Sequence, residues 1–216
     1  MSAGNVEGRA GESAGEAWLA VADGLVAGVH HALNNRLGTM SALAQLVAMG
    51  GTPRTDTQAA LRQELDRFGS TLRLLGFVPR RPEESQIPLA LPDLLADLLG
   101  LASQHRDVRD VEFAVTAPPD LLPVLCPETA LSHALLALLV SAGIAARGGG
   151  STRVEVRCSG DERFVTVEVV PGGSAEGDSL RDEGITALFA AAGGEAVAAG
   201  AGVVARLPTL VEGRKE

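Results

Sequence analysis

Two helices are predicted by the spacing of apolar residues in the first third of the chain. A helical pattern runs from about Ser13 to Met49, with apolar residues three or four positions apart, as one face of a helix requires. Those residues are Leu25, Val29, Leu33, Leu37, Met40, Ala44 and Val47. The segment Gly50-Gly51-Thr52-Pro53 ends this pattern, and Thr55 or Thr57 can cap a second helix.

The second helix repeats apolar residues at alternating spacings of four and three, which is a heptad seam. Its members are Leu61, Leu65, Phe68, Leu72 and Leu75, and Pro79 and Pro82 follow them. Two helices alone bury little apolar surface. The hairpin therefore predicts a homodimer in which two hairpins form a four-helix bundle. The alternative is that the hairpin packs on a second domain of the same chain.

A second domain is predicted beyond the polar, proline-containing linker from Arg80 to Pro88. Helices are expected at Pro92–Gln104, Pro127–Arg147 and Leu180–Ala192, and strands at Asp110–Thr116, Thr152–Ser159, Arg163–Val170, Glu195–Ala199 and Gly202–Leu207. The dipeptide Gly160-Asp161 marks a hairpin turn. The fold class is α+β, with one sheet covered by helices. The expected organisation is a disordered segment at 1–12, a helical hairpin at 13–80 and an α/β sandwich at 86–212.

Composition narrows the range of partners and locations. The net charge is −9, which disfavours nucleic acid and anionic membrane surfaces because both attract basic proteins. The N-terminus has no basic region followed by an apolar stretch, and no apolar run approaches the ~18 residues of a membrane span. We therefore expect a cytoplasmic protein. The two cysteines, Cys126 and Cys158, lie in apolar contexts and are expected to be inert core thiols.

The first helix carries two adjacent histidines that point in different directions. With Leu33 at the centre of the apolar stripe, His31 lies about 160° away and faces solvent, whereas His30 lies about 60° away and is expected to be half-buried. Asn35 shares the face of His31, as do Gly28 and Gly38. Two glycines on an exposed helix face each cost about 1 kcal/mol relative to alanine. That cost is reasonable if the backbone of a partner approaches there.

The segment from His31 to Leu37, His-Ala-Leu-Asn-Asn-Arg-Leu, resembles the H-box of sensor histidine kinases, commonly written H-E-L-N-N-P-L. The heptad helix that follows is similar to the second helix of their dimerisation and phosphotransfer domain. The second domain resembles their ATP-binding domain in outline, including the closing Gly193-Gly194 and Leu207-Pro208 elements. The resemblance covers roughly residues 15–210. It implies that His31 accepts a phosphoryl group.

The chain departs from the kinase pattern where ATP would bind and react. Ala32 replaces the acidic residue that acts as general base, and Ser141 replaces the asparagine that holds magnesium, with Ala137 at a second asparagine position of the same motif. Pro171 stands where an aspartate bonds the adenine amino group. The glycine-rich lid is reduced to Asp182-Glu183-Gly184-Ile185, whose carboxylates repel a triphosphate. The second domain is therefore expected not to bind ATP, and the protein not to phosphorylate itself.

These departures resemble dimeric histidine phosphotransferases built on a degenerate kinase plan. The resemblance implies that His31 shuttles phosphoryl groups between receiver domains of response regulators, with Nε2 attacking in line. Asn35 orients the histidine or a water, and Asn34, Gly28 and Gly38 belong to the receiver-binding face. Arg36 either contacts an acidic receiver surface or is simply solvated. No cofactor of the protein's own is expected, because the receiver brings its magnesium.

A non-catalytic adaptor that binds a two-component kinase or regulator is the alternative. Ala32 favours the adaptor, whereas the histidine, both asparagines and the flanking glycines favour chemistry.

Overall fold

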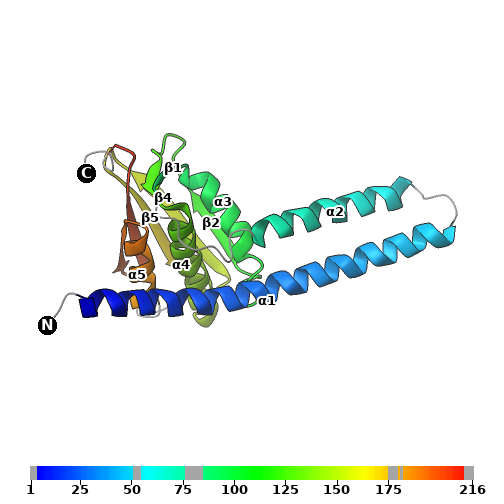
Figure 1. Cartoon of the computed structure of the whole chain (residues 1–216), viewed down its shortest axis with the longest axis horizontal. Helices are drawn as coiled ribbons and strands as arrows, with labels where there is room; N and C mark the ends of the chain where they lie inside the picture. Colours follow the sequence, from blue (N-terminus) through cyan, green and yellow to red (C-terminus); the bar gives the residue numbers. More distant parts are fainter. Residues whose placement is uncertain (1–3, 51–54, 76–84, 175–179, 181, 212–216) are drawn as a thin grey trace.

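The computed structural model describes residues 4–50, 55–75, 85–174, 180 and 182–211. Its first feature is a helical hairpin that projects from an α/β body (Figure 1). Helix α1 runs from Gly4 to Gly50 and helix α2 from Thr55 to Leu75. The predicted hairpin is confirmed, but α1 begins at Gly4. Residues 4–12, expected to be disordered, continue the first helix.

The α/β body contains three helices, α3 (Leu91–Ala102), α4 (Glu128–Gly148) and α5 (Glu183–Ala191). Its strands are β1 (Ile87–Leu89), β2 (Glu112–Thr116), β3 (Val124–Cys126), β4 (Arg153–Gly160), β5 (Phe164–Pro171), β6 (Glu195–Ala199) and β7 (Gly202–Pro208). The expected α+β class is therefore confirmed. Strands β1 and β3 were not predicted, because three residues are too few to show an alternating pattern.

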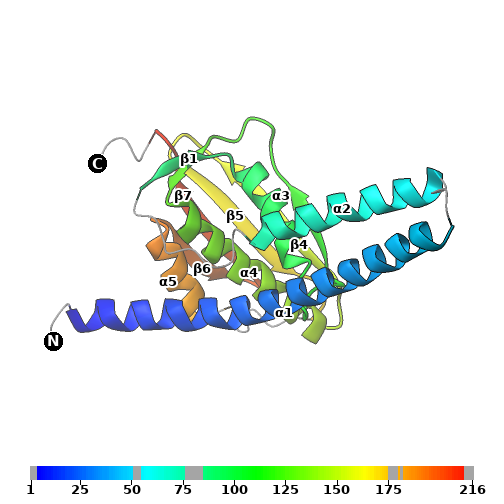
Figure 2. The ribbon, with the colours of Figure 1, turned by 45° about the vertical axis from the view of Figure 1, so that its right-hand side comes forward.

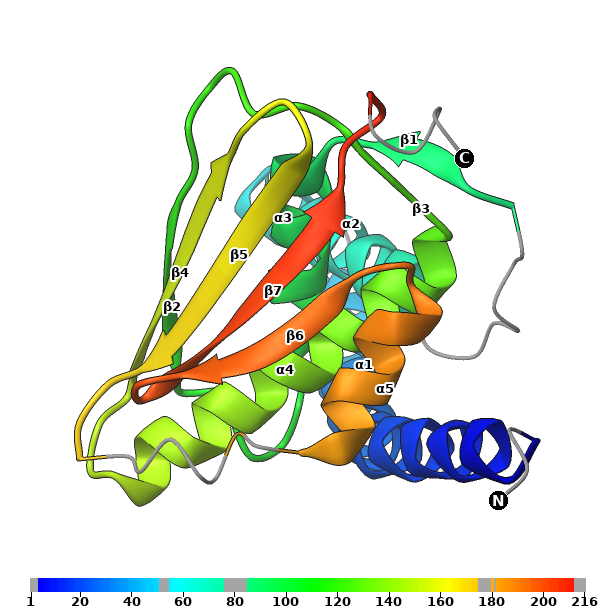
Figure 3. The ribbon, with the colours of Figure 1, turned by 90° about the vertical axis from the view of Figure 1, so that its left-hand side faces the viewer.

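One five-stranded sheet, in the order β2-β4-β5-β7-β6, forms one layer of the body and lies in front of the helices in Figure 3. Strand β2 runs parallel to β4, and the remaining neighbours are antiparallel, including the predicted hairpins β4–β5 and β6–β7. The helices cover one face. The other face is open and carries ion pairs from Arg157 to Glu155 and Glu168. The predicted sandwich of one sheet and one helical layer is thus the observed architecture.

Helix α4 lies at the centre of the core. It packs against β4 and β5 on one side and against α1, α3 and α5 on the other. Contrary to the expectation that no segment is long and apolar enough to cross a membrane, Glu128–Gly148 passes that test by length and composition. However, 89% of its apolar window is buried within the protein, as in the core helix of a soluble domain.

Helix α1 belongs to both parts of the molecule. Its first half crosses the helical layer, and its second half leaves the body to pair with α2 (Figures 1 and 2). Val21, Leu25 and Val29, all from the predicted apolar stripe or one turn before it, are buried in the core of the α/β body. Leu37, farther along the stripe, is half exposed. Val21, Leu25 and Val29 of the segment expected to belong to the hairpin thus pack in the core of the α/β body.

Candidate functional site

His31 lies two residues beyond Val29, at the point where α1 leaves the α/β body. Its side chain is exposed, as predicted, and borders an open cleft of about 460 Å³. The cleft lies between α1 and the loop that follows α3. Its lining consists of Ala27, Gly28, His31, Ala32 and Asn35 from α1, and Ser103, Gln104, Arg106 and Arg109 from the loop.

Asn35 fixes the ring of His31. The two residues are one helical turn apart, and the Asn35 Nδ2 atom lies 3.0 Å from His31 Nε2. Where the Asn35 amide nitrogen donates this hydrogen bond, Nε2 accepts it and the ring proton lies on Nδ1. That tautomer has its lone pair on Nε2, the nitrogen predicted to attack.

His30 and Asn34 repeat the same pairing one position earlier. Asn34 Nδ2 lies 3.2 Å from His30 Nε2, but neither residue lines the cleft. The expectation that His30 is half-buried is wrong. Its side chain is exposed, because α1 has already begun to leave the body at this point. The pair therefore offers a chemically matched control for His31 and Asn35.

Two glycines of α1 allow the loop that follows α3 to pack closely against this helix beside the cleft. A methyl group on Gly28 would overlap the carbonyl oxygen of Gln104, and one on Gly24 would overlap the ring of His105. A backbone does approach this face, as the glycines indicated, but it is a backbone of the same chain. A methyl group added to Gly38 would meet no atom of the described residues within 4 Å, so this position remains open to a partner.

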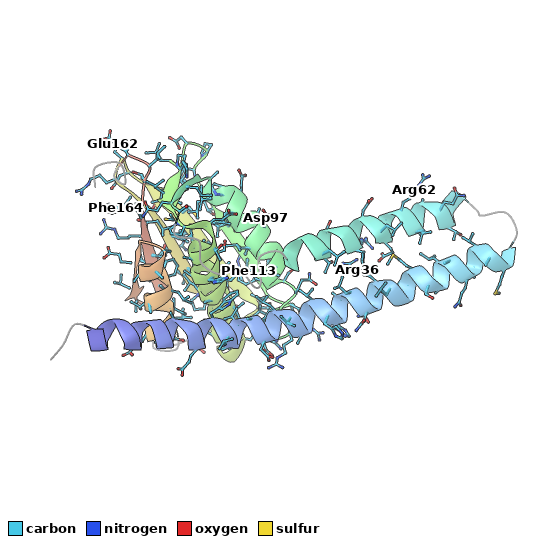
Figure 4. All side chains as sticks on the ribbon, viewed as in Figure 1. Arg36, Arg62, Asp97, Phe113, Glu162 and Phe164 are labelled. Atoms are coloured by element: carbon cyan, nitrogen blue, oxygen red, sulfur yellow. The ribbon has the colours of Figure 1, made fainter. Side chains whose placement is uncertain are left out.

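Arg36 is 26% exposed and pairs with a residue of α2. It lies between α1 and α2 (Figure 4), where its Nη1 atom is 3.5 Å from Oε2 of Glu64. Glu64 also pairs with Arg67 at 2.7 Å. The Arg36–Glu64 contact ties the two helices of the hairpin together next to the site.

The loop that follows α3 is held at several points. The backbone N–H of Asp107 donates to Nδ1 of the buried His105 at 3.2 Å, and Arg147 Nη1 donates to the Asp107 carbonyl at 2.6 Å. Arg106 and Arg109 extend from this fixed backbone into solvent and line the cleft. Sequence reasoning did not find these arginines, since an irregular loop has no period that would place them beside His31.

Burial lowers the pKa of His105 below its ordinary value of 6.5, with Asp107 and Asp23 opposing this effect and Arg106 adding to it. The native state therefore takes up a proton less readily than the unfolded chain. We expect the free energy of unfolding to be steady above about pH 6.5 and to fall as the pH drops below it.

Urea unfolding at about pH 7.5 and about pH 5.5, for the wild type and His105→Gln, checks this expectation. The wild type should lose more stability between the two pH values than the variant does. Equal losses would show that the acid sensitivity arises from other groups.

Three of the positions that depart from the kinase pattern lie together beneath α1. Ala137, Ser141 and Asp182 line a cavity of about 150 Å³ whose other wall includes Ala17 and Val21 of α1. A methyl group on Gly184, in the reduced lid, would overlap Ala17. Trp18 stacks on His133 of α4, with ring centroids 3.6 Å apart and planes inclined by 14°.

The thiols and acidic groups supply no second site within the described ranges. Burial raises the pKa of Cys126 to about 12 and that of Cys158 to about 11, so both are the inert core thiols that were predicted. In the same part of the chain, no group of three or more histidine, cysteine, aspartate or glutamate residues is arranged to hold a metal ion.

No family model matches the sequence, and no curated protein matches it either. The comparison with solved structures does find matches. The Acinetobacter baumannii histidine kinase AdeS is 13% identical with a TM-score of 0.40, and the match covers 83% of this chain and 96% of that one. Full-length ShkA in complex with AMPPNP is 20% identical with a TM-score of 0.43, covering 86% of this chain and 45% of ShkA.

The ATP-binding domain of PrrB from Mycobacterium tuberculosis is 20% identical with a TM-score of 0.47, covering 58% of this chain and 98% of that one.

Proposed function

We propose that the protein is a histidine phosphotransferase that relays phosphoryl groups between response-regulator receiver domains through His31, without ATP-dependent autophosphorylation. The observation that carries the proposal is the state of His31. The side chain is exposed at an open cleft, and Asn35 Nδ2 lies 3.0 Å from Nε2, where it orients the ring. Attack on an aspartyl phosphate needs a neutral imidazole nitrogen.

The step requires little from the protein beyond this nitrogen. The Nε2 lone pair forms a bond to phosphorus while the bond between phosphorus and the aspartyl oxygen breaks. The electrons of the broken bond leave with the receiver's carboxylate, and the ring keeps its proton on Nδ1. Asn35 must release Nε2 before attack, so its role is to orient the ring until the receiver docks. The receiver supplies the magnesium.

The packing of α1 supports the absence of ATP chemistry. The cavity bordered by Ala137, Ser141 and Asp182 holds about 150 Å³, whereas pockets for drug-sized ligands hold roughly 300–1,000 Å³. Trp18 and Ala17 of α1 occupy the approach to these positions. A nucleotide would have to displace a helix whose Val21 and Leu25 are buried in the core.

Trp18 is the only tryptophan of the chain, so its fluorescence reports on this packing. We expect Mg-ATP to leave the Trp18 emission unchanged and radiolabelled ATP to give no acid-labile label. Val21→Asp, which loosens α1 from the body, should shift the emission and so prove the reporter responsive. A saturable change in wild-type emission on adding ATP would contradict the proposal and revive an active kinase.

The protein is proposed to act as a homodimer, and the seam of α2 supports this. Leu61 and Phe68, seven residues apart, are partly buried. The other row of the seam, Leu65 and Leu72, is more exposed, at 51% and 45%. One row is therefore partly covered in this chain and the second is left for another helix. Leu46 and Met49 near the tip of α1 are exposed as well.

Replacing Leu65 and Leu72 with glutamate should convert the dimer to a monomer, as judged by light scattering. Burial of one leucine is worth about 1.5–3 kcal/mol, and the symmetric dimer contains each residue twice. Val197→Glu, at an equally exposed position on β6, is the control and should not change the mass. A wild type that is monomeric at micromolar concentration would contradict the proposed dimeric four-helix bundle.

A non-catalytic adaptor is the second candidate, and the cleft contains one observation in its favour. Ala32 lines the cleft where the kinases have a general base, and none of the described residues that line it is acidic. Incubation with a panel of radiolabelled phosphorylated receiver domains separates the two functions. Acid-labile label on the protein supports the relay, whereas stable binding to a receiver without transfer supports the adaptor.

A further inference from the structure

The cleft beside His31 has a charge opposite to that of the chain as a whole. The chain carries a net charge of −9, but the ionisable residues that line this cleft are His31, Arg106 and Arg109. Asp107 and Asp110 pair with these arginines at 3.3 and 3.7 Å, and neither lines the cleft. Among the residues that the structure describes, the cleft therefore offers guanidinium groups, and no carboxylate, to whatever approaches His31.

The fold gives these arginines a fixed base. Gly28 lets the Gln104 backbone lie directly on α1, His105 is buried against Gly24, and Arg147 holds the carbonyl of Asp107. The side chains of Arg106 and Arg109 themselves are about two-thirds exposed. A rigid backbone with exposed cationic ends, each of which pairs, among the described residues, only with the aspartate next to it in the sequence, is suited to meeting an anionic surface rather than to stabilising the fold.

We propose that Arg106 and Arg109 recognise the anionic surface around the phosphorylated aspartate of a receiver domain and hold it against His31. The inference rests on the proposed relay and names its docking residues in the second domain. A phosphorylated receiver presents an acyl phosphate among carboxylates, and guanidinium groups pair with both. The arginines are positioning residues: the bond to phosphorus forms at His31 Nε2, and no proton passes through them.

The test compares wild type with Arg106→Ala/Arg109→Ala in two reactions. The first is transfer from the receiver domain that donates fastest, at increasing receiver concentration and ionic strength. The second is labelling of His31 by phosphoramidate, a small donor that carries a phosphoryl group but no protein surface. Arg157→Ala/Arg206→Ala, which also removes two positive charges, but from the open face of the sheet, is the matched control. Arg106→Lys/Arg109→Lys tests rescue.

We expect the alanine variant to slow transfer from the receiver roughly tenfold or more through KM, with kcat kept, and to flatten its salt dependence. Phosphoramidate labelling and Tm should not change, and the lysine variant should recover part of the rate. Unchanged transfer from the receiver would overturn the inference. An equal loss of rate in both reactions would also overturn it, because the arginines would then contact the phosphoryl group itself or stabilise the fold.

A binding experiment distinguishes failure of the proposed relay from failure of the docking role. Binding of a receiver whose aspartate carries beryllofluoride, a stand-in for the phosphoryl group, is measured for the same variants. A wild type that accepts no phosphate but binds this receiver, with the binding lost in the alanine variant, would overturn the relay and support the docking role. Binding that is indifferent to both arginines would overturn the docking role alone.

Discussion

His31→Ala is expected to abolish acid-labile phosphate on the protein after incubation with a phosphorylated receiver. The side chain is exposed and lines the cleft, so its removal should leave the fold intact while removing the nucleophile. The quantity to measure is radiolabel retained at neutral pH and lost on brief acid treatment. We expect label at background level for the variant, with binding of the receiver largely preserved.

His30→Ala provides the control for this experiment. His30 is also exposed and also pairs with an asparagine four residues later, at 3.2 Å, but it does not line the cleft. Its loss should leave the label near the wild-type level. Label that survives in His31→Ala and disappears in His30→Ala would transfer the proposed role to the other histidine. Label in both variants would place the acceptor elsewhere.

Gly28→Ala is expected to separate the loop from α1 and to impair both stability and transfer. The added methyl group would overlap the Gln104 carbonyl oxygen, which is backbone and cannot rotate away. Overpacking of this kind costs about 1–3 kcal/mol, partly offset by the roughly 1 kcal/mol that alanine contributes inside a helix. Urea unfolding should show a net loss of stability, and the transfer rate should fall because Arg106 and Arg109 move away from His31.

Gly38→Ala is the matched substitution on the same helix. No atom of the described residues lies within 4 Å of the position of its added methyl group, so only the gain of up to about 1 kcal/mol from helix propensity is expected. The two variants should therefore differ in stability by about 1–3 kcal/mol. Equal stabilities would show that the loop yields to the methyl group, and the docking of Gln104 on α1 would then not position the site.

Helix α1 belongs to both the hairpin and the α/β body, and this fixes the position of the site. The stripe that includes Leu25 and Val29 is buried in the α/β body, and His31 follows it on the same helix without an intervening linker. The orientation of His31 toward Arg106 and Arg109 is therefore set by the packing of α1 on the body. In contrast, a flexible connection would leave the histidine and the arginines free to separate.

Much of the local structure could be predicted because it depends on periodicity within one segment. The alternation in β4 and β5 predicted that hairpin, but the expected Gly160-Asp161 turn did not give its register, because Gly160 is still in β4 and pairs with Val165. The spacing of His31 and Asn35 likewise predicted that they share a helix face. It could not predict the partner of Arg36, because Glu64 lies on another helix and the contact depends on how the two helices pair.

The sequence by itself determined the helical hairpin, the order along the chain of the three helices and the five strands of the large sheet in the α/β body, and the exposed pair of His31 and Asn35. All of these follow from spacings of two, three or four residues along one segment. Only the tertiary structure decided that the first half of α1 is buried against α4 and α5 and that Gly24 and Gly28 seat the loop carrying Arg106 and Arg109. The physical reason is that an apolar stripe or a glycine shows that something packs closely at that position, but it carries no information about which distant segment does so.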